Sequence, residues 1–410
     1  MAPKRFPAYQ VIDGLKYGKS YLPENVRSAR SYVPQDDDLV LVSYLKCGNN
    51  WLEQIIQLIL HRMTLRLHVE ASFPIQEQDP LQIQAPFHIQ EQGLLEIGTP
   101  PGPGTVTDLR ALPDHVPGLP PDLALDPAPV TGPDPVPDFQ RGPEIPVTHR
   151  QGAQMSPRGE SAANYVEFHK RTPYPELTGM HYLNKAQPPR FLKTHFPYEH
   201  QLKNPKAKFI YLTRNPLDTC VSFYYYVRCA AVYEFLDGSF DDFVQAFVMG
   251  EVERGDYCDH LLSWFPHKNE RNVFFVTYEQ LKGDFRNTVL TLADFIGPEY
   301  RRMLEEDEAV YRNVVEKSSV SFMKKLCRVD KTVLEKLTDE DRFFLDAADR
   351  FYKENVEVKE SPVVRKGVVG DWKMHFSQEQ LDSMRDWIQR KRAAGVIREI
   401  WRDMDLGGIA

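Results

Sequence analysis

Short apolar runs that alternate with helical patterns are the feature that most constrains the fold of this chain. The runs cover residues 39–44, 190–192, 208–212 and 273–277. Short runs of apolar residues are typical of strands that are buried on both faces. Strands that alternate with helices form a parallel sheet with helices packed against it. The sequence therefore predicts the α/β class, as a single domain with a central parallel sheet flanked by helices.

The helical patterns that follow these runs have recognisable starts. Residues 51–60 are apolar almost all round, as expected of a helix that packs on a sheet. Pro216 suits the first turn of a helix, where the missing N–H group would have no partner in any case. The residues after Tyr278 read as helical. Helical periodicity also dominates from Glu299 to the end, apart from a loop near residues 360–371.

A proline-rich stretch interrupts this pattern. Eighteen of the 32 prolines lie between Pro74 and Pro157, and residues 98–146 are dense in proline and glycine without a repeat. Such a segment buries too little apolar surface to offset the entropy of ordering. We therefore expect one domain made of residues 1–70 and 165–410, interrupted by a disordered insert at residues 71–164. A recognition arm and a translated intron are the alternative interpretations of the insert.

Charge and cysteine content narrow the classes of protein. The net charge of −8 argues against a general binder of nucleic acid or of anionic membranes. Five cysteines without a CxxC pair indicate free thiols in a reducing compartment, and metal-ligand spacing is absent from the sequence. The first ten residues lack an apolar signal region, and apolar runs stay far below the ~18 residues of a membrane span. These observations predict a cytoplasmic protein without a metal.

The loop at residues 45–50 is the first candidate site. It leaves a predicted strand and enters a predicted helix, whose unpaired N–H groups attract anions. Lys46 adds a full positive charge, and Gly48 permits close approach of the backbone. The loop does not have the GxxxxGK[ST] pattern of a Walker A loop. An ordinary turn between a strand and a helix is the alternative interpretation.

Lys193 and His195 form the second candidate. Their spacing of two places both side chains on one face of an extended strand. They stand at the carboxyl end of that strand, where open α/β sheets bind ligands. A neutral histidine there can accept the proton of a substrate hydroxyl. Taken alone, a surface lysine beside a surface histidine would explain this pair.

Three further segments place cations or polar groups after strands or in loops. Arg214 follows a strand and can hold a phosphate with two hydrogen bonds, although an ion pair with Asp218 is the alternative. Ser222 lies two turns into the following helix and can supply a hydroxyl group. The cationic residues at 365 and 366, followed by a glycine, are equally consistent with a solvated charged loop.

Taken together, these segments resemble the cytosolic sulfotransferase family over residues 39–68 and about 165–376. The family pattern reads PKSGTTW, KTH, RNPxDxxVS, YExLK and RKGxxGDWK. The last four parts are matched here by Lys193-Thr194-His195, by residues 214–222, by residues 278–282 and by residues 365–373. The resemblance implies a P-loop-like fold and transfer of a sulfonate group from 3′-phosphoadenosine 5′-phosphosulfate (PAPS). The implied acceptor is a hydroxyl or amine of a small molecule such as a phenol, a steroid or another alcohol.

The resemblance also implies roles for individual residues. His195 would be the general base. Lys46 and Lys193 would stabilise the negative charge on the sulfonate group during transfer and on the departing phosphate. The residues implied at the 5′ end and the adenine are Lys46, Cys47, Gly48, Asn49, Asn50, Trp51 and Tyr278. Those implied at the 3′-phosphate are Arg214, Ser222, Arg365, Lys366 and Gly367, and Ser319 is expected to contact the nucleotide as well.

Several positions depart from the family pattern. Asn49 and Asn50 replace two threonines, and Val320 replaces a phenylalanine that stacks on adenine. Loss of that aromatic face would cost about 1–3 kcal/mol by analogy with base stacking. A nucleotide-binding protein without turnover is therefore a second hypothesis, and a P-loop kinase of related topology is a third. Residues 374–382 keep little of the family's dimer motif, which argues against a homodimer.

Overall fold

The computed structural model describes residues 6–72, 165–327 and 363–410. The chain divides into one unit of residues 1–75 with 157–410 and a second unit of residues 76–156. Almost all of the expected insert lies outside the described residues, and the prediction that the insert is disordered concerns those same residues.

A four-stranded parallel sheet forms the centre of the first unit. Its strands are β3 (Leu39–Ser43), β4 (Phe191–Thr194), β5 (Lys208–Thr213) and β6 (Val273–Thr277), in the order β4-β3-β5-β6. All three neighbouring pairs are parallel, and Val42 lies opposite Thr194 on one side and Tyr211 on the other. The predicted α/β class, with its parallel sheet, is confirmed.

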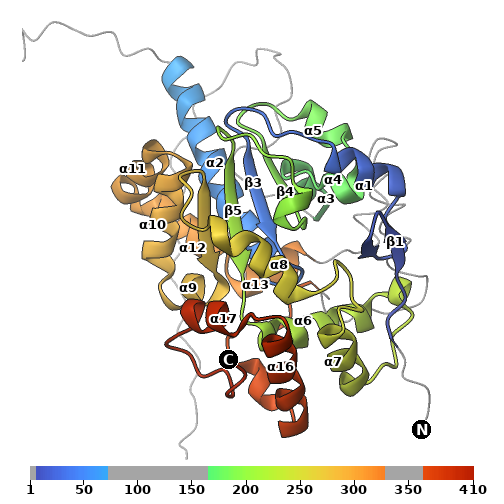
Figure 1. The fold of residues 1–410 in the computed structure, drawn as a ribbon. Helices are drawn as coiled ribbons and strands as arrows, with labels where there is room; N and C mark the ends of the chain where they lie inside the picture. The colour runs from blue at the N-terminus through green and yellow to red at the C-terminus, as the bar shows by residue number, and fades with distance from the viewer. Residues whose placement is uncertain (1–5, 73–164, 328–362) are drawn as a thin grey trace, which may run out of the picture. The chain divides into compact units, whose positions relative to one another are not determined.

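Helices cover the sheet (Figure 1). Those that begin just after its strands are α2 (Asn49–Ser72), α6 (Pro216–Cys229) and α9 (Tyr278–Gly283). The other strands and α-helices described before β6 are β1 (Gln10–Ile12), β2 (Leu15–Tyr17), α1 (Pro23–Arg30), α3 (Tyr165–Arg171), α4 (Pro175–Thr178), α5 (His181–Lys185), α7 (Phe240–Val248) and α8 (Tyr257–Trp264). Those after α9 are α10 (Phe285–Ile296), α11 (Pro298–Glu306), α12 (Glu308–Lys317), α13 (Val320–Leu326), the short helix η5 (Asp371–Met374), α16 (Gln378–Arg390) and α17 (Ala394–Ile400).

Side-chain caps fix where several of these helices start. Asn215 accepts a hydrogen bond from the backbone N–H of Asp218 at the start of α6. Thr277 and Gln280 form a reciprocal capping box at the start of α9. The chain therefore turns directly from β5 and from β6 into a helix. These turns hold the residues that follow both strands at one edge of the sheet.

Two sequence-based expectations needed correction. The helix expected at residues 51–60 begins at Asn49 and continues to Ser72, because residues 61–72 include several strong helix formers, among them arginine, leucine, glutamate and alanine. Helical structure after Glu299 is divided among separate elements, with breaks at Asp307 and at Ser318-Ser319. The side chains of Asp307 and Ser319 cap the helices that follow them. Short polar side chains favour such starts over helix interiors.

The amino ends of β3 and β4 are joined by a buried ion pair. Arg190 donates two hydrogen bonds of 2.8 Å to the two carboxylate oxygens of Asp38. Val40, Leu41 and Val42 are fully buried between the helical layers above this pair. The residues at the carboxyl ends of the same strands are the ones that face a cavity.

Candidate active site

A cavity of about 440 Å³ lies at the carboxyl ends of the parallel strands. The segments that follow β3, β4, β5 and β6 all contribute to its lining, as expected for ligand sites in open α/β sheets. The predicted site residues that line it are Lys46, Gly48, Asn49, Asn50, Trp51, Lys193, His195, Arg214, Ser222, Tyr278, Ser319, Arg365, Lys366 and Gly367. Six segments that are distant in sequence thus meet around one space.

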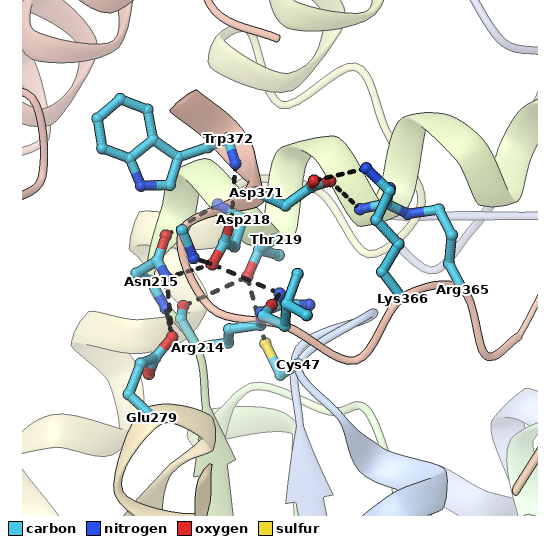
Figure 2. A network of polar contacts seen from close by, with 12 residues as sticks. Cys47, Arg214, Asn215, Asp218, Thr219, Glu279, Arg365, Lys366, Asp371 and Trp372 are labelled. Carbon is cyan, nitrogen blue, oxygen red and sulfur yellow. Dashed lines mark hydrogen bonds and ion pairs between the residues drawn. The ribbon is translucent and has the colours of Figure 1, made fainter. Parts of the chain in front are cut away.

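Cys47 is the predicted residue whose side chain does not line the cavity. The thiol is fully buried, and its Sγ atom lies 3.9 Å from Thr219 Oγ1 on α6 (Figure 2). Burial raises the pKa of the Cys47 thiol to about 12, so the group is neutral. The side chain supports the loop from beneath, and any contact of this residue with a ligand must come from its backbone.

The loop between β3 and α2 has an unusual backbone conformation. Lys46 has φ 65° and Gly48 has φ 102°, and both angles lie in the left-handed region. A Cβ atom on Gly48 would stand 2.6 Å from Cδ2 of Tyr278. Position 48 therefore needs glycine for its backbone conformation and also for its contact with the Tyr278 ring. The α2 helix starts at Asn49, so the unpaired N–H groups of its first turn lie at the cavity wall.

Lys46 extends from this loop along the cavity. Its Nζ atom donates a hydrogen bond of 3.2 Å to the Val363 carbonyl oxygen and lies 4.4 Å from the centre of the Tyr226 ring. Desolvation lowers the pKa of Lys46 to about 7, and the positive charges of Arg214 and Arg365 act in the same direction. An anion bound beside Lys46 would favour its charged form.

His195 has a defined tautomer. Its Nδ1 atom lies 2.7 Å from the carbonyl oxygen of Ser43. A carbonyl oxygen can only accept, so Nδ1 carries the proton and Nε2 carries the lone pair. Burial lowers the pKa of His195 well below 6.5, with further contributions from the charges of Arg254 and Lys193. The ring is therefore neutral at pH 7 and is prepared to accept a proton at Nε2.

Lys193 is the most enclosed cation of the cavity wall. Its side chain is 3% exposed, and Nζ donates a hydrogen bond of 2.7 Å to Glu53 Oε2 on α2. The same Nζ lies 2.9 Å from His169 Nδ1 on α3. The structure thus gives Lys193 two partners that the sequence did not reveal.

Arg214 lies between an aromatic ring and a backbone carbonyl group. Its guanidinium lies 4.4 Å from the centre of the Tyr278 ring, and Nη2 donates a 2.8 Å hydrogen bond to the Val368 carbonyl oxygen. The alternative pairing with Asp218 is also present, at 3.4 Å. Among the residues that the structure describes, no hydrogen-bond partner reaches the buried Nε atom of Arg214. One buried donor of this cation therefore remains unsatisfied at the cavity.

Asp218 and Asp371 organise the loop that follows Val363 (Figure 2). Asp218 accepts hydrogen bonds from the backbone N–H groups of Gly370 and Trp372, at 2.8 and 3.0 Å. Asp371 is paired with both Arg365 and Lys366. These cations hold the pKa of Asp371 at about 2 despite its burial, so the carboxylate is charged. The single negative charge of Asp371 thus offsets only part of the charge of these two cations. The Arg365 Nε atom is buried without a partner in the described part of the chain.

An aromatic cluster forms another part of the wall. The Trp51 ring stands edge-on to Tyr278, with centroids 5.4 Å apart, and stacks on Phe285 at 6.0 Å. The Lys282 ammonium ion lies 5.2 Å from the centre of the Trp51 ring. Flat apolar faces beside cations suit a planar heterocycle that carries phosphate.

Val320 and Gly367 face each other at the same cavity. A Cβ atom on Gly367 would stand 2.6 Å from Val320 Cγ2, and Gly367 has φ 69°. The valine therefore fills the space beside the glycine with a smaller, non-aromatic side chain than the family pattern has. Ser319, which precedes it, caps α13 by accepting a hydrogen bond from the Phe322 N–H group.

The sequence did not predict Glu53, His169 or Asp371 as residues of the site. Glu53 did carry a signal, because it is a charged residue inside a nearly all-round apolar helix, where a buried carboxylate needs a partner. Asp371 lies within the motif matched at residues 365–373, although no role followed for it from the sequence, and His169 carried no signal that distinguishes it from a solvent-exposed residue. Within residues 6–72, 165–327 and 363–410, no cluster of three or more metal-ligating side chains occurs. No helix in the same ranges is long and apolar enough to span a bilayer.

Comparison with known proteins gives consistent matches. The family model for the sulfotransferase domain matches residues 36–396. Sulfotransferase 2B1 of Mus musculus is 34% identical over 217 residues, which are 52% of this chain and 56% of that protein. Sulfotransferase 1E1 of Cavia porcellus is 28% identical over 62% of this chain and 78% of its own. The chain thus spans a little over half the length of the mouse relative.

Solved structures show the same fold. The structure of mouse sulfotransferase SULT7A1 complexed with PAP aligns over 97% of this chain and 99% of its own, with a TM-score of 0.54 and 19% identity. Retinol dehydratase in complex with androsterone and PAP aligns over 95% of this chain and 90% of its own, with a TM-score of 0.51 and 16% identity. Because the family model covers most of its length, this chain belongs to the sulfotransferase domain family.

Proposed function

We propose that this protein transfers a sulfonate group from PAPS to a hydroxyl or amine group of a small-molecule acceptor. One observation carries the proposal: a neutral histidine with its lone pair on Nε2 shares a cavity with cations from four separate segments. Lys46, Lys193, Arg214 and Arg365 supply those cations. The local concentration of positive charge contrasts with the negative charge of the whole chain.

The cavity suits a nucleotide that is charged at both ends. In the described part of the chain, the buried Nε donors of Arg214 and Arg365 have no hydrogen-bond partner, and a bound anion would be a suitable acceptor for such donors. Lys46 and the start of α2 would hold the 5′ end, and the rings of Trp51 and Tyr278 would contact the base. Related structures contain PAP, the nucleotide that remains when PAPS loses its sulfonate group.

The proposed reaction needs a base, positioned reactants and stabilisation of charge. PAPS supplies the sulfonate group. His195 Nε2 takes the proton of the acceptor hydroxyl as that oxygen forms its bond to sulfur. The electron pair of the broken sulfur–oxygen bond goes to the phosphate, where Lys46 stabilises the negative charge. Lys193 would contact the sulfonate group during its transfer.

The acceptor would bind beside His195. Tyr21, Tyr174 and Leu177 line the cavity there, and the Tyr174 ring and the imidazole are nearly perpendicular, with centroids 5.3 Å apart. Aromatic and aliphatic walls suit a phenol, a steroid or another alcohol. A cytoplasmic location and the absence of a homodimer stay predictions from the sequence.

Transfer of radiolabelled sulfonate from PAPS to a mixed library of phenols, steroids, alcohols and amines tests this function. We expect labelled product with the wild-type protein and none with His195→Ala, while both proteins bind PAP. Folded wild-type protein that labels no acceptor in the library would contradict the proposal.

A nucleotide-binding protein without turnover is the second candidate. Two observations favour it: Val320 offers no aromatic face to a base, and the Asp371 carboxylate is already paired with Arg365 and Lys366. Calorimetry with PAP separates the candidates when it is combined with the transfer assay. Tight binding of PAP without sulfonate transfer supports the second candidate. If the protein neither binds PAP nor transfers sulfonate, both candidates are excluded.

A further inference from the structure

Glu53, Lys193 and His169 form a buried polar cluster at the cavity wall. They come from α2, β4 and α3, and Glu53 is fully buried. Lys193 and His169 line the cavity, whereas Glu53 stands behind them and does not. A carboxylate this deeply buried persists only where cations and hydrogen bonds compensate it. The cluster therefore joins the cavity to the apolar core.

The hydrogen bonds of the cluster orient the Lys193 ammonium ion. An ammonium ion has three N–H donors. One reaches Glu53 Oε2 at 2.7 Å and another reaches His169 Nδ1 at 2.9 Å. Within the described ranges, no hydrogen-bond partner is found for the third. Two fixed donors leave a single direction for the remaining N–H group.

His169 can fill the role of acceptor only when it is neutral. Lysine can only donate, so His169 Nδ1 must carry a lone pair. Burial lowers the pKa of His169 to about 4, with a further contribution from the positive charge of Lys193. Glu53 Oε1 stands 3.6 Å from the same Nδ1 atom, which is too far for a good hydrogen bond. His169 is thus an acceptor for Lys193 over the whole neutral range.

We propose that Glu53 is a positioning residue for sulfonate transfer. With His169, it holds the Lys193 ammonium ion so that its third N–H group is directed at the group being transferred. This inference rests on the proposed function. It assigns to Glu53 an indirect role, exerted through Lys193 rather than through contact with the nucleotide or the acceptor.

Replacement of Glu53 by glutamine is the first test. Glu53→Gln keeps the size of the side chain and removes its charge, which leaves the buried ammonium ion without a carboxylate. We expect kcat to fall at least about tenfold, because a displaced contact at the reacting group is costly. The KM for the acceptor and the affinity for PAP should change by less than about twofold, because neither would contact Glu53.

A double-mutant cycle with Lys193→Ala shows whether Glu53 acts through Lys193. In the Lys193→Ala background, Glu53→Gln should change kcat by less than about twofold, because the side chain it positions is gone. An undiminished effect of Glu53→Gln in that background would overturn the inference. So would a kcat of Glu53→Gln equal to that of the wild type.

Asp38→Asn supplies a matched control. Asp38 is also a buried carboxylate paired with a cation across β3 and β4, but it lies at the amino ends of the strands and away from the cavity. Its replacement should lower the melting temperature and leave kcat near the wild-type value. A matching drop in kcat for Asp38→Asn would show that loss of any buried ion pair impairs turnover, and the specific role of Glu53 would be refuted.

Nucleotide binding gives a readout that does not depend on turnover. We expect Glu53→Gln and Lys193→Ala to lower the affinity for PAPS relative to PAP, measured by calorimetry without acceptor, because only PAPS carries the sulfonate group. An unchanged ratio in both variants would overturn the inference. If the wild-type protein binds both nucleotides but transfers no sulfonate, the proposed function fails. The ratio of the affinities for PAPS and PAP in the variants still tests whether Glu53 positions Lys193. Absence of binding to either nucleotide would refute both.

Discussion

The Nδ1 atom of His195 lies 2.7 Å from the carbonyl oxygen of Ser43, across the β3–β4 pair. This contact fixes the proton on Nδ1 and leaves the lone pair on Nε2. The backbone N–H of the same residue donates a 3.0 Å hydrogen bond to Glu176 Oε1. The imidazole is thus held by its ring and by its backbone, so its orientation does not depend on a ligand.

Removal of the His195 imidazole should greatly slow transfer while nucleotide binding persists. We expect His195→Ala to lower kcat by about 10²- to 10⁴-fold, the usual contribution of a general base. The affinity for PAP should stay within about twofold, since the ring faces the acceptor side. Steady-state kinetics and calorimetry measure the two quantities. A large loss of PAP affinity would show that His195 supports the nucleotide site instead.

The rate at saturating substrates should be level through neutral pH. The pKa of His195 is lowered well below its ordinary 6.5, so the neutral form persists to lower pH than in an ordinary histidine. Activity should therefore fall only as the pH drops through that lowered value. A kcat profile between about pH 6 and 8 checks this, since an ordinary histidine titrates within that range. A fall in kcat near pH 6.5 would contradict the lowered pKa.

Nucleotide binding should weaken as the pH rises above 7. The pKa of Lys46 is lowered from 10.5 to about 7, so its charged form is populated below pH 7 and lost above it. Binding of PAP at higher pH must then include uptake of a proton, at a cost of up to about 1.4 kcal/mol for each pH unit. Calorimetry in buffers with different ionisation enthalpies measures the uptake. In Lys46→Arg, whose side chain stays charged, the uptake should vanish.

A methyl group at position 48 should disturb the site more than one in a distant turn. Gly48→Ala places its Cβ atom 2.6 Å from the Tyr278 ring at φ 102°, whereas Gly14 has φ 89° with no atom within 4 Å of its Cβ position. Both replacements should cost about 1 kcal/mol or more of unfolding free energy through their backbone conformation. We expect Gly48→Ala alone to weaken PAP binding. Equal affinities for PAP in the two variants would show that the contact with Tyr278 is not needed.

Neutralisation of Asp371 should tighten nucleotide binding. The Asp371 carboxylate is paired with Arg365 and Lys366, and a 3′-phosphate would compete with it for both cations. We expect Asp371→Asn to raise the affinity for PAP by about threefold to tenfold, which corresponds to about 1 kcal/mol. Asp405→Asn, which removes the exposed partner of Lys373, should leave the affinity unchanged. Weaker binding by Asp371→Asn would show that the carboxylate holds the loop in its binding conformation.

The strands were predictable because their signal is local. The apolar runs at residues 39–44, 208–212 and 273–277 became β3, β5 and β6 with bounds within one residue of those expected. Pro216 begins α6 as expected, because proline suits a first helical turn. Helix ends were less predictable, since they depend on caps and on packing with neighbouring elements. The sequence thus determined the class of the fold and which residues stand at strand ends.

Only the tertiary structure decided how the charged groups pair. Lys193 and Glu53 are 140 positions apart, and His195 and Ser43 are 152 positions apart. Periodicity and composition describe neighbours along the chain, whereas these contacts depend on strand order and register. The sequence therefore determined which cations and which base could serve a nucleotide site. The tertiary structure decided which of these groups face the cavity and which are paired with carboxylates. It also decided which ring nitrogen of each imidazole carries the proton, because burial and hydrogen-bond partners determine the charge and the tautomer of a buried group.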